Sequence, residues 1–126
     1  MILADTSVWI DHFRSDNPQM REHLQNKRIV MHPFIAGELA LGSLPDRTSV
    51  LKALDELPQL IVAEAYEVRQ LIEQRKLYSK GIGWIDAQFL VCMLIEPSIQ
   101  LWTTDRRLAR VASEIGIQLH PGSLPN

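Results

Sequence analysis

Residues 1–13 read MILADTSVWIDHF, and they place a charged side chain directly after a short apolar run. The run Ile2–Ala4 is typical of a buried strand, and the residues Ser7–Phe13 favour a short helix. Asp5 is therefore expected at the end of a buried strand, where a charge is costly unless it has a partner. An explanation for this charge has to come from residues elsewhere in the chain.

Short apolar runs alternate with helical patterns along the whole chain. The runs predicted as strands are Ile2–Ala4, Ile29–Met31, Leu60–Ala63, Ile99–Trp102 and Ile117–Leu119. Helices are predicted at Ser7–Phe13 (with Thr6 or Ser7 as N-cap), Pro18–Gln25, Pro33–Gly42, Pro45–Leu57, Glu64–Ser79, Trp84–Ile95 and Asp105–Ile115. This alternation predicts an α/β fold in which a small, mainly parallel sheet of about five short strands is covered by helices on both sides.

Composition sets broad limits on the function. The 126 residues are 46% hydrophobic and 22% charged, which suits one globular domain over residues 1–126, and the final PGSLPN is expected to fray. No apolar run reaches the roughly 20 residues that cross a bilayer, so no membrane is expected. The single cysteine, Cys92, suits a reducing cytoplasm and is expected to be buried. A net charge of −2 argues against a bulk polycation but does not exclude a nucleic-acid enzyme.

Four acids interrupt otherwise apolar stretches. Asp5 and Asp105 each follow a predicted strand, so both should lie at one edge of the sheet, where α/β folds place their sites. Asp86 lies in the first turn of an apolar helix, and Glu38 lies inside a helix among small and apolar residues. Asp86 and Asp105 could instead be helix caps, and Asp5 a solvent-facing loop acid. Glu38 has no such structural explanation, and the combination of the four favours a functional cluster.

Clustered carboxylates point to a metal ion. They repel one another, and one would have a raised pKa unless a cation neutralised the group. Ligands that are all oxygens suit Mg²⁺ or Mn²⁺. Such a site can activate a water and stabilise an in-line displacement at phosphorus. The cluster therefore predicts metal-assisted phosphodiester hydrolysis.

The stretches around these acids resemble the PIN-domain nucleases, and more closely the VapC toxins of bacterial toxin–antitoxin pairs. They are ILADTSVWID, FIAGELALG, GIGWIDAQFL and LWTTDRRLARVA, in the order of the family and covering essentially the whole chain. The resemblance implies an α/β/α sandwich and a Mg²⁺- or Mn²⁺-dependent endoribonuclease that cleaves cellular RNA and blocks translation. It also implies inhibition by a cognate VapB antitoxin, whose tail would occupy the acidic groove.

Residue roles follow from the same resemblance. Asp5 and Asp86 look like the main metal ligands, with Asp105 holding the metal directly or through water. Glu38 would complete the cluster and help to orient the attacking water. The supporting hydroxyls would be Ser7 and Thr103. From their positions in the sequence, the candidate RNA-binding cations are Arg106, Arg107, Arg110, Lys80 and Arg14.

Other conspicuous residues favour structural roles. The four histidines lack zinc-ligand spacing, and Gly81-Ile82-Gly83 predicts a turn rather than a dinucleotide fingerprint. The three tryptophans are expected in the core, although Trp84 lies near the predicted groove.

Two alternative functions also use acids at such positions or such a fold. A phospho-accepting receiver would need an acidic pair after the first strand and a lysine after the last, and neither is present. A non-catalytic RNA- or protein-binding module is the remaining alternative, but four mutually repelling acids would then serve no purpose. Replacing Asp5 or Asp86 with Asn is expected to abolish cleavage and to raise stability without metal. A homodimer is predicted from apolar residues in excess of what a small sheet needs: Leu39, Leu41, Val50, Leu51, Leu54 and Leu57.

Overall fold

The computed structural model of the protein describes residues 1–123. Its elements are β1 (Ile2–Ala4), α1 (Thr6–Ser15), α2 (Pro18–Gln25), β2 (Ile29–Val30), α3 (Pro33–Ala40), α4 (Arg47–Glu56), α5 (Ala65–Arg75), α6 (Trp84–Ile95), β3 (Gln100–Trp102), α7 (Arg106–Glu114) and the 3₁₀ helix η1 (Pro121–Ser123). The sheet has three parallel strands in the order β2-β1-β3. The predicted α/β class with a parallel sheet is confirmed.

Strand β1 is the centre of the molecule. Ile2 pairs with Ile29 on one side and with Gln100 on the other, and the side chains of all three residues of β1 are buried. A central parallel strand is covered on both faces, which explains why this short run has no polar residue before Asp5. The carboxyl ends of β1 and β3 therefore lie side by side, and the chain after each strand enters a helix.

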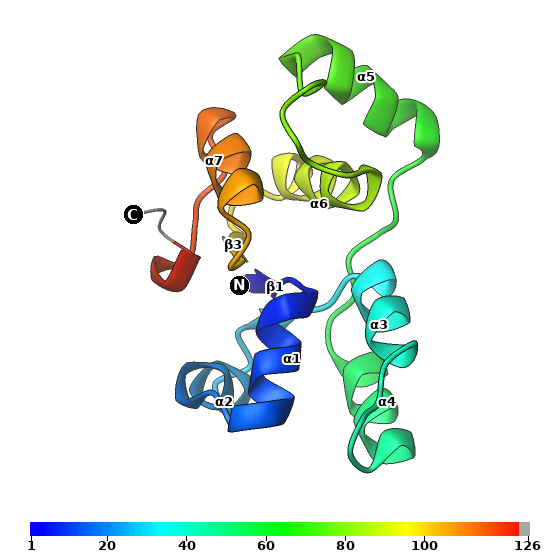
Figure 1. Ribbon diagram of the computed structural model, residues 1–126, viewed down its shortest axis with the longest axis vertical. Helices are drawn as coiled ribbons and strands as arrows, with labels where there is room; N and C mark the ends of the chain where they lie inside the picture. The colour runs from blue at the N-terminus through cyan, green and yellow to red at the C-terminus, as the bar shows by residue number, and fades with distance from the viewer. Residues whose placement is uncertain (124–126) are drawn as a thin grey trace.

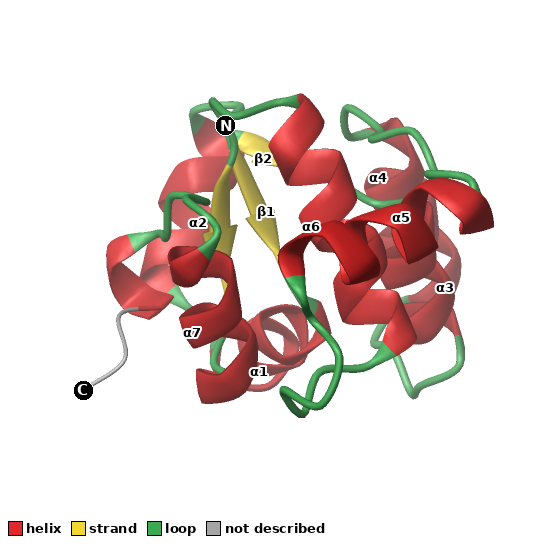
Figure 2. Cartoon of the chain, turned by 90° about the horizontal axis from the view of Figure 1, so that it is seen from above, coloured by secondary structure: helices red, strands yellow, loops and turns green. Residues whose placement is uncertain are grey.

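Helices cover both faces of the sheet. In Figure 1 the strands lie between α1 and α2 on one side and α6 and α7 on the other. Figure 2 shows β1 from above, running beside α6. Helix α5 packs on α6, while α3 contacts both α1 and α4. Among the described residues, no helix is both long and apolar enough to span a membrane.

The sheet is smaller than the sequence predicts. The predicted strand Leu60–Ala63 is replaced by a single parallel bridge just before it, Met31 with Gln59, and Ile117–Leu119 is reduced to the bridge of Leu101 with Leu119. A side chain takes the place of the missing strand partner at the first of these segments. The amide of Gln88 in α6 accepts from the N–H of Ala63 at 2.6 Å and donates to its carbonyl at 3.0 Å.

Helix limits also differ from the prediction at specific backbone positions. The N-cap of α1 is Asp5, rather than Thr6 or Ser7, because the Asp5 carboxylate accepts from the N–H of Val8. Helix α5 ends at Arg75 instead of continuing to Ser79. Lys76 adopts a left-handed conformation (φ 55°), which ends the helix.

The C-terminal segment is ordered where it was expected to fray. Residues 121–123 form η1, and Ser123 is buried. Its hydroxyl accepts from the N–H of Thr103 at 2.8 Å and donates to the carbonyl of Leu101 at 3.0 Å. The prediction of fraying for residues 124–126 lies outside the described residues.

The structure corrects one prediction about apolar residues and reduces the support for another. Trp9 and Trp102 are buried as expected, but Trp84 is 45% exposed. Most of the residues from which a homodimer was predicted pack inside the chain: Leu39 and Leu54 are buried, and Val50, Leu51 and Leu57 are partly buried against the core. Only Leu41, which is 89% exposed, leaves an apolar side chain free on this part of the surface.

Candidate active site

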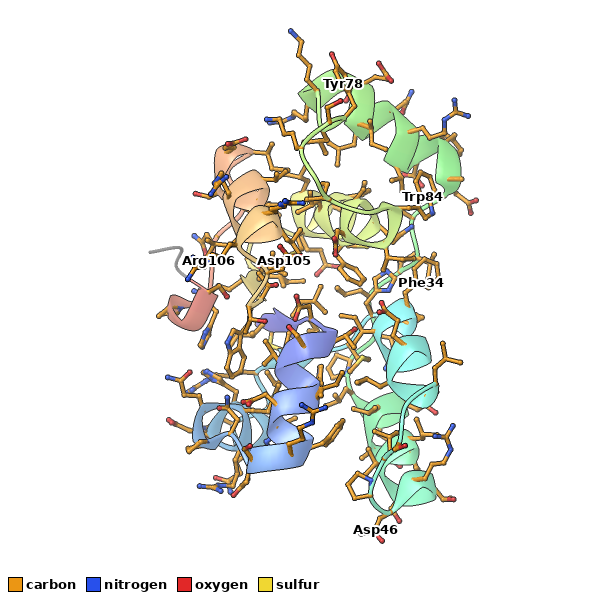
Figure 3. All side chains as sticks on the ribbon, in the orientation of Figure 1. Phe34, Asp46, Tyr78, Trp84, Asp105 and Arg106 are labelled. Atoms are coloured by element: carbon orange, nitrogen blue, oxygen red, sulfur yellow. The ribbon has the colours of Figure 1, made fainter. Side chains whose placement is uncertain are left out.

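The four predicted acids line one pocket. It has a volume of about 360 Å³, and its lining comprises Asp5, Thr6, Ser7, Glu38, Asp86, Phe89, Thr104 and Asp105. The acids come from four parts of the fold: the end of β1, helix α3, the first turn of α6, and the start of α7, where Figure 3 labels Asp105. The sheet edge chosen from the sequence is therefore where the acids meet.

Asp5 is the most buried of the four and is held by several hydrogen bonds. Its exposed fraction is 9%. The oxygen Oδ1 accepts from the Ser7 hydroxyl at 2.7 Å and from the N–H of Val8 at 3.5 Å, while Oδ2 accepts from the Thr103 hydroxyl. These donors compensate the burial of the charge. Asp5 is thus not a solvent-facing loop acid.

Thr103 connects two of the acids. Its hydroxyl donates to Asp5 and accepts from the backbone N–H of Asp105 at 3.0 Å. The adjacent Thr104 hydroxyl lies 2.7 Å from the Ser7 hydroxyl, so the ends of β1 and β3 are joined twice. Thr104 was missed in the sequence, although its place beside Thr103 in LWTTD was the available signal.

Asp86 and Asp105 both contact the N-terminus of a helix through one oxygen. Asp105 is the N-cap of α7, where Oδ1 accepts from the N–H groups of Arg107 and Leu108 at 2.9 and 3.1 Å. Asp86 Oδ2 accepts from the N–H of Gly83 at 3.3 Å. Both acids therefore do stabilise a helix N-terminus, which is the alternative role that the sequence suggested for them. Within residues 1–123, the second oxygen of each carboxylate has no hydrogen-bond partner.

Two of the acids in the pocket have raised pKa values. Burial raises the pKa of Asp86, the Gly83 N–H opposes this shift, and the charges of Asp105 and Asp5 add to it. Partial burial and the charge of Asp86 raise the pKa of Glu38, and the Thr6 hydroxyl opposes that shift. Both carboxylates are thus harder to ionise than usual, because burial disfavours their charged form and because the neighbouring acids carry charges of the same sign.

The donor set fits a hard divalent cation in its chemistry. Among the described residues, no three carboxylate, imidazole or thiol groups are already arranged around one point as metal ligands. However, Mg²⁺ keeps several of its waters and is usually held by one or two carboxylates. The free oxygens of Asp86 and Asp105 and the carboxylate of Glu38 line one pocket with only oxygen donors. Asp5, predicted as a main ligand, has both oxygens engaged in hydrogen bonds. Only the remaining lone pairs of these oxygens are available to a metal ion.

The candidate RNA-binding cations do not form one group. Lys80, Arg107 and Arg110 line a separate cavity between the segment 80–83 and α7. Arg106, one residue earlier than Arg107, does not line it. Arg14 lines a third cavity, which is described next.

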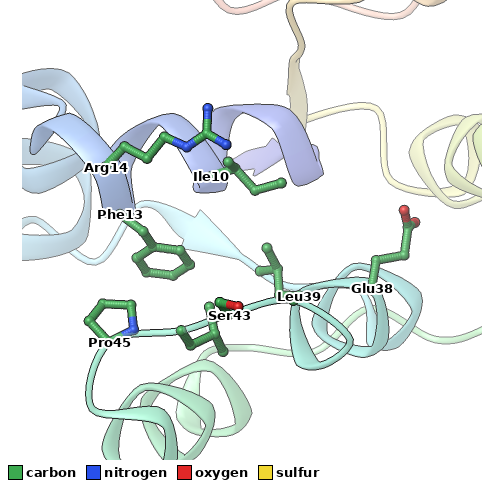
Figure 4. Close-up of a pocket in the computed structure, with 9 residues that line it drawn as sticks. Ile10, Phe13, Arg14, Glu38, Leu39, Ser43 and Pro45 are labelled. Carbon is green, nitrogen blue, oxygen red and sulfur yellow. The ribbon is translucent and has the colours of Figure 1, made fainter.

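That third cavity lies on the other side of Glu38. It has a volume of about 420 Å³ and lies between α1, α3 and the segment 42–45. Figure 4 shows Ile10 and Leu39 pointing toward each other, Phe13 and Pro45 at one end, and Glu38 at the other. The cavity is lined mainly by apolar side chains, with one cation, Arg14, and one carboxylate, Glu38.

Comparison with known proteins assigns this arrangement to a family. Residues 2–114 match the model of the PIN domain. The chain therefore belongs to the PIN-domain family, whose nucleases are hydrolases. Within it, the chain is similar to Ribonuclease VapC32 of Mycobacterium tuberculosis, from the strains CDC 1551 / Oshkosh and ATCC 25618 / H37Rv. To each it is 40% identical over 119 residues, which cover 94% of this chain and 96% of the relative. The resemblance to VapC-type PIN domains seen in the sequence is thus confirmed.

Proposed function

We propose that the protein is the toxin of a type II toxin–antitoxin pair and acts as a Mg²⁺- or Mn²⁺-dependent endoribonuclease. The observation that carries the proposal is the pocket in which Asp5, Glu38, Asp86 and Asp105 meet. The similarity to a relative named as a ribonuclease supports the same activity. Without a cation and an anionic substrate, the mutual repulsion of these acids would only cost stability.

The acids divide into holding and positioning roles. Asp86 and Asp105 would hold the cation through their free oxygens, with Asp5 as a further ligand. When bound, the ion lowers the pKa of a coordinated water and stabilises the charge that develops on the phosphate. Glu38 is the acid without a capping role, and its raised pKa suits a group that orients a water and accepts its proton. Thr103 and Ser7 fix the Asp5 carboxylate and so keep the end of β1 in place.

A cleavage assay with single-stranded RNA tests this proposal. The wild-type protein should cleave the RNA with Mn²⁺ or Mg²⁺ and stop when EDTA is added. Asp86→Asn should abolish cleavage while the circular dichroism spectrum stays unchanged. The matched control is Asp55→Asn, because Asp55 is an exposed acid on α4, away from the pocket. Wild-type activity in the Asp86→Asn protein would refute the metal assignment, and a wild-type protein that binds RNA without cutting it would indicate a binding module instead.

We further propose that a VapB-type antitoxin inhibits the protein by placing a peptide segment across the acidic pocket and the neighbouring apolar cavity. Apolar side chains would enter between Ile10 and Leu39, and a basic side chain would approach Glu38. Expression of the chain alone should arrest growth, and co-expression of the small gene product encoded beside it should restore growth. Continued growth on expression of the active protein alone would contradict the toxin role but not the nuclease activity.

A further inference from the structure

A basic cavity lies beside the acidic pocket. It has a volume of about 220 Å³ and lies between the segment 80–83 and α7, with Lys80, Arg107, Arg110, Val111 and Glu114 as its lining. The α7 residues recur at intervals of three and four, so they share one face of the helix. Three cations face one carboxylate here, whereas the whole chain has a net charge of −2.

The cations of this cavity are available to a ligand. Lys80 Nζ lies 2.9 Å from Glu114 Oε2, but both side chains are more than a third exposed, and exposed ion pairs contribute little to stability. In the part of the chain that the structure describes, neither Arg107 nor Arg110 forms an ion pair with a carboxylate. A phosphate could therefore bind the guanidinium groups without first breaking a strong internal contact.

Gly81 holds Arg107 close to the neighbouring segment. A Cβ atom at Gly81 would lie 2.9 Å from Cδ and 3.0 Å from Nη1 of Arg107, so a larger residue here would require the Arg107 side chain to move. Gly81 also has a φ of +79°, a conformation that other residues rarely adopt. The Arg107 side chain is thus exposed and lies beside the backbone of the segment at Gly81.

The same two segments also carry the acids, so the basic cavity has a fixed position relative to the acidic pocket. Helix α7 begins at its N-cap Asp105, and with a rise of 1.5 Å per residue Arg107 and Arg110 lie about 3 and about 7.5 Å further along its axis. On the other side, the segment 80–83 leads directly into α6 and Asp86.

We propose that this cavity is a subsite for the RNA backbone, in which Arg107 and Arg110 bind a phosphate next to the bond that is cleaved. The inference rests on the ribonuclease function proposed above. The planar guanidinium group matches phosphate oxygens in a bidentate fork. Two such groups beside four carboxylates offset the repulsion that an acidic pocket exerts on a polyanion.

The first test measures binding without catalysis. In EDTA and in an Asp86→Asn background, a labelled single-stranded oligoribonucleotide is titrated by fluorescence anisotropy at several salt concentrations. Arg107→Gln with Arg110→Gln should weaken binding about tenfold and reduce the slope of log K against log salt by about 0.7, the value for one lost phosphate contact on a single strand. The matched control is Arg69→Gln with Arg75→Gln on α5, which removes the same charge elsewhere and should change neither quantity.

A second variant should act in the opposite direction. Glu114→Gln removes the only carboxylate of the cavity and releases Lys80, so RNA should bind several-fold more tightly. Misfolding cannot produce such a gain. Unchanged affinity and salt slope in the Arg107/Arg110 variant, or an equal loss in the α5 control, would overturn the subsite. Wild-type RNA affinity in the Arg107/Arg110 variant together with loss of binding to a labelled polyglutamate peptide would also overturn it, in favour of a protein partner.

Cleavage kinetics separate this inference from the proposed function. With Mn²⁺ and an otherwise wild-type chain, the Arg107/Arg110 variant should raise KM about tenfold and change kcat less than twofold. If the wild-type protein does not cleave RNA, the proposed function fails, while the anisotropy experiment still decides the subsite. If the wild type cleaves and the variant keeps its KM, only the subsite is wrong.

Discussion

Three of the four acids stabilise the start of a helix. Asp5 and Asp105 are the N-caps of α1 and α7, and Asp86 lies in the first turn of α6. The positive ends of three helix dipoles therefore point toward one pocket, and they offset part of the repulsion among the carboxylates. Glu38, in the middle of α3, has no such help. These observations explain how the folded chain can hold four acids together.

Substitution by asparagine should have opposite effects on stability at Asp86 and at Asp5, although the sequence predicted an increase at both. Asp86→Asn keeps an oxygen that can accept from Gly83 and removes a charge whose pKa is raised, so metal-free stability should increase. Both carboxylate oxygens of Asp5 accept a hydrogen bond, whereas Asp5→Asn leaves one acceptor oxygen and puts a donating N–H₂ group at the other position. The free energy of unfolding should therefore fall by about 1–3 kcal/mol. Urea unfolding in EDTA measures both. Stabilisation by Asp5→Asn would show that repulsion outweighs its hydrogen bonds.

The pH dependence of stability has a definite sign for this pocket. Glu38 and Asp86 have raised pKa values in the folded state, so their ionisation opposes folding. Their full contribution is present below the pKa values of the unfolded chain and is lost as the pH rises through the folded values. In EDTA, the Glu38→Gln/Asp86→Asn protein should therefore gain more over the wild type at pH 7 than at pH 4. An equal gain at both pH values would contradict this assignment.

Thr103 should act as a positioning residue for both acids it contacts. Thr103→Val leaves Asp5 Oδ2 and the N–H of Asp105 without partners, at a cost of about 1–3 kcal/mol. Thr103→Ser keeps the hydroxyl and should retain most of the stability and cleavage. Urea unfolding and kcat, measured for both variants, check this expectation. If the two variants behave alike, the hydroxyl has no part in placing the acids.

Residue identity explains what could be predicted about the site. A carboxylate inside an apolar frame is conspicuous, which is why Glu38 and the three aspartates were found together. Hydroxyls are common in turns and caps, so Thr6 and Thr104 gave no signal of their own. The N-cap of α1 was assigned to a hydroxyl for the same reason, because the geometry that lets Asp5 reach the N–H of Val8 is not visible in a sequence.

At the scale of elements, the helices were predictable and the outer strands were not. A helix satisfies its backbone hydrogen bonds within its own segment, so its pattern in the sequence is sufficient. A strand needs a partner along its length, and the apolar run Leu60–Ala63 pairs with backbone only at Leu60, whose N–H donates to the carbonyl of Met31, while the side chain of Gln88 binds Ala63. The sulfur of Cys92 likewise donates to the carbonyl of Ile61. Such replacement of a strand by side chains leaves no periodic signal.

The C-terminal segment supports the strand that carries the site. His120 stacks on Trp102 at 4.3 Å between ring centroids, and Ser123 binds the backbone of Leu101 and Thr103. Ser123→Ala should leave the buried N–H of Thr103 without a partner and lower the free energy of unfolding by about 1–3 kcal/mol. Ser113→Ala, on the exposed face of α7, is the control and should change it little. Urea unfolding tests the pair, and an unchanged Ser123→Ala protein would show that η1 does not brace β3.

At the scale of the whole molecule, charge and apolar surface are arranged around the acidic pocket. The basic cavity of α7 lies on one side, and the cavity of α1 and α3, lined mainly by apolar side chains, lies on the other. Overall charge and composition describe none of this, since a net charge of −2 averages over regions of opposite sign. The arrangement suits a polyanion on one side and an apolar peptide segment on the other, with the acids accessible to both.

The homodimer remains a prediction, and the structure leaves fewer exposed apolar residues to support it. A homodimer was expected from the apolar residues of α3 and α4, yet only Leu41 among them is fully exposed. If α3 and α4 form the interface, light scattering should give twice the chain mass of 14.4 kDa, and Leu41→Asp should convert the dimer to a monomer. Ile61→Asp is the matched control, because Ile61 is 84% exposed but lies outside α3 and α4. A monomeric wild type would refute the dimer, whereas dissociation by Ile61→Asp alone would move the interface to the segment before α5.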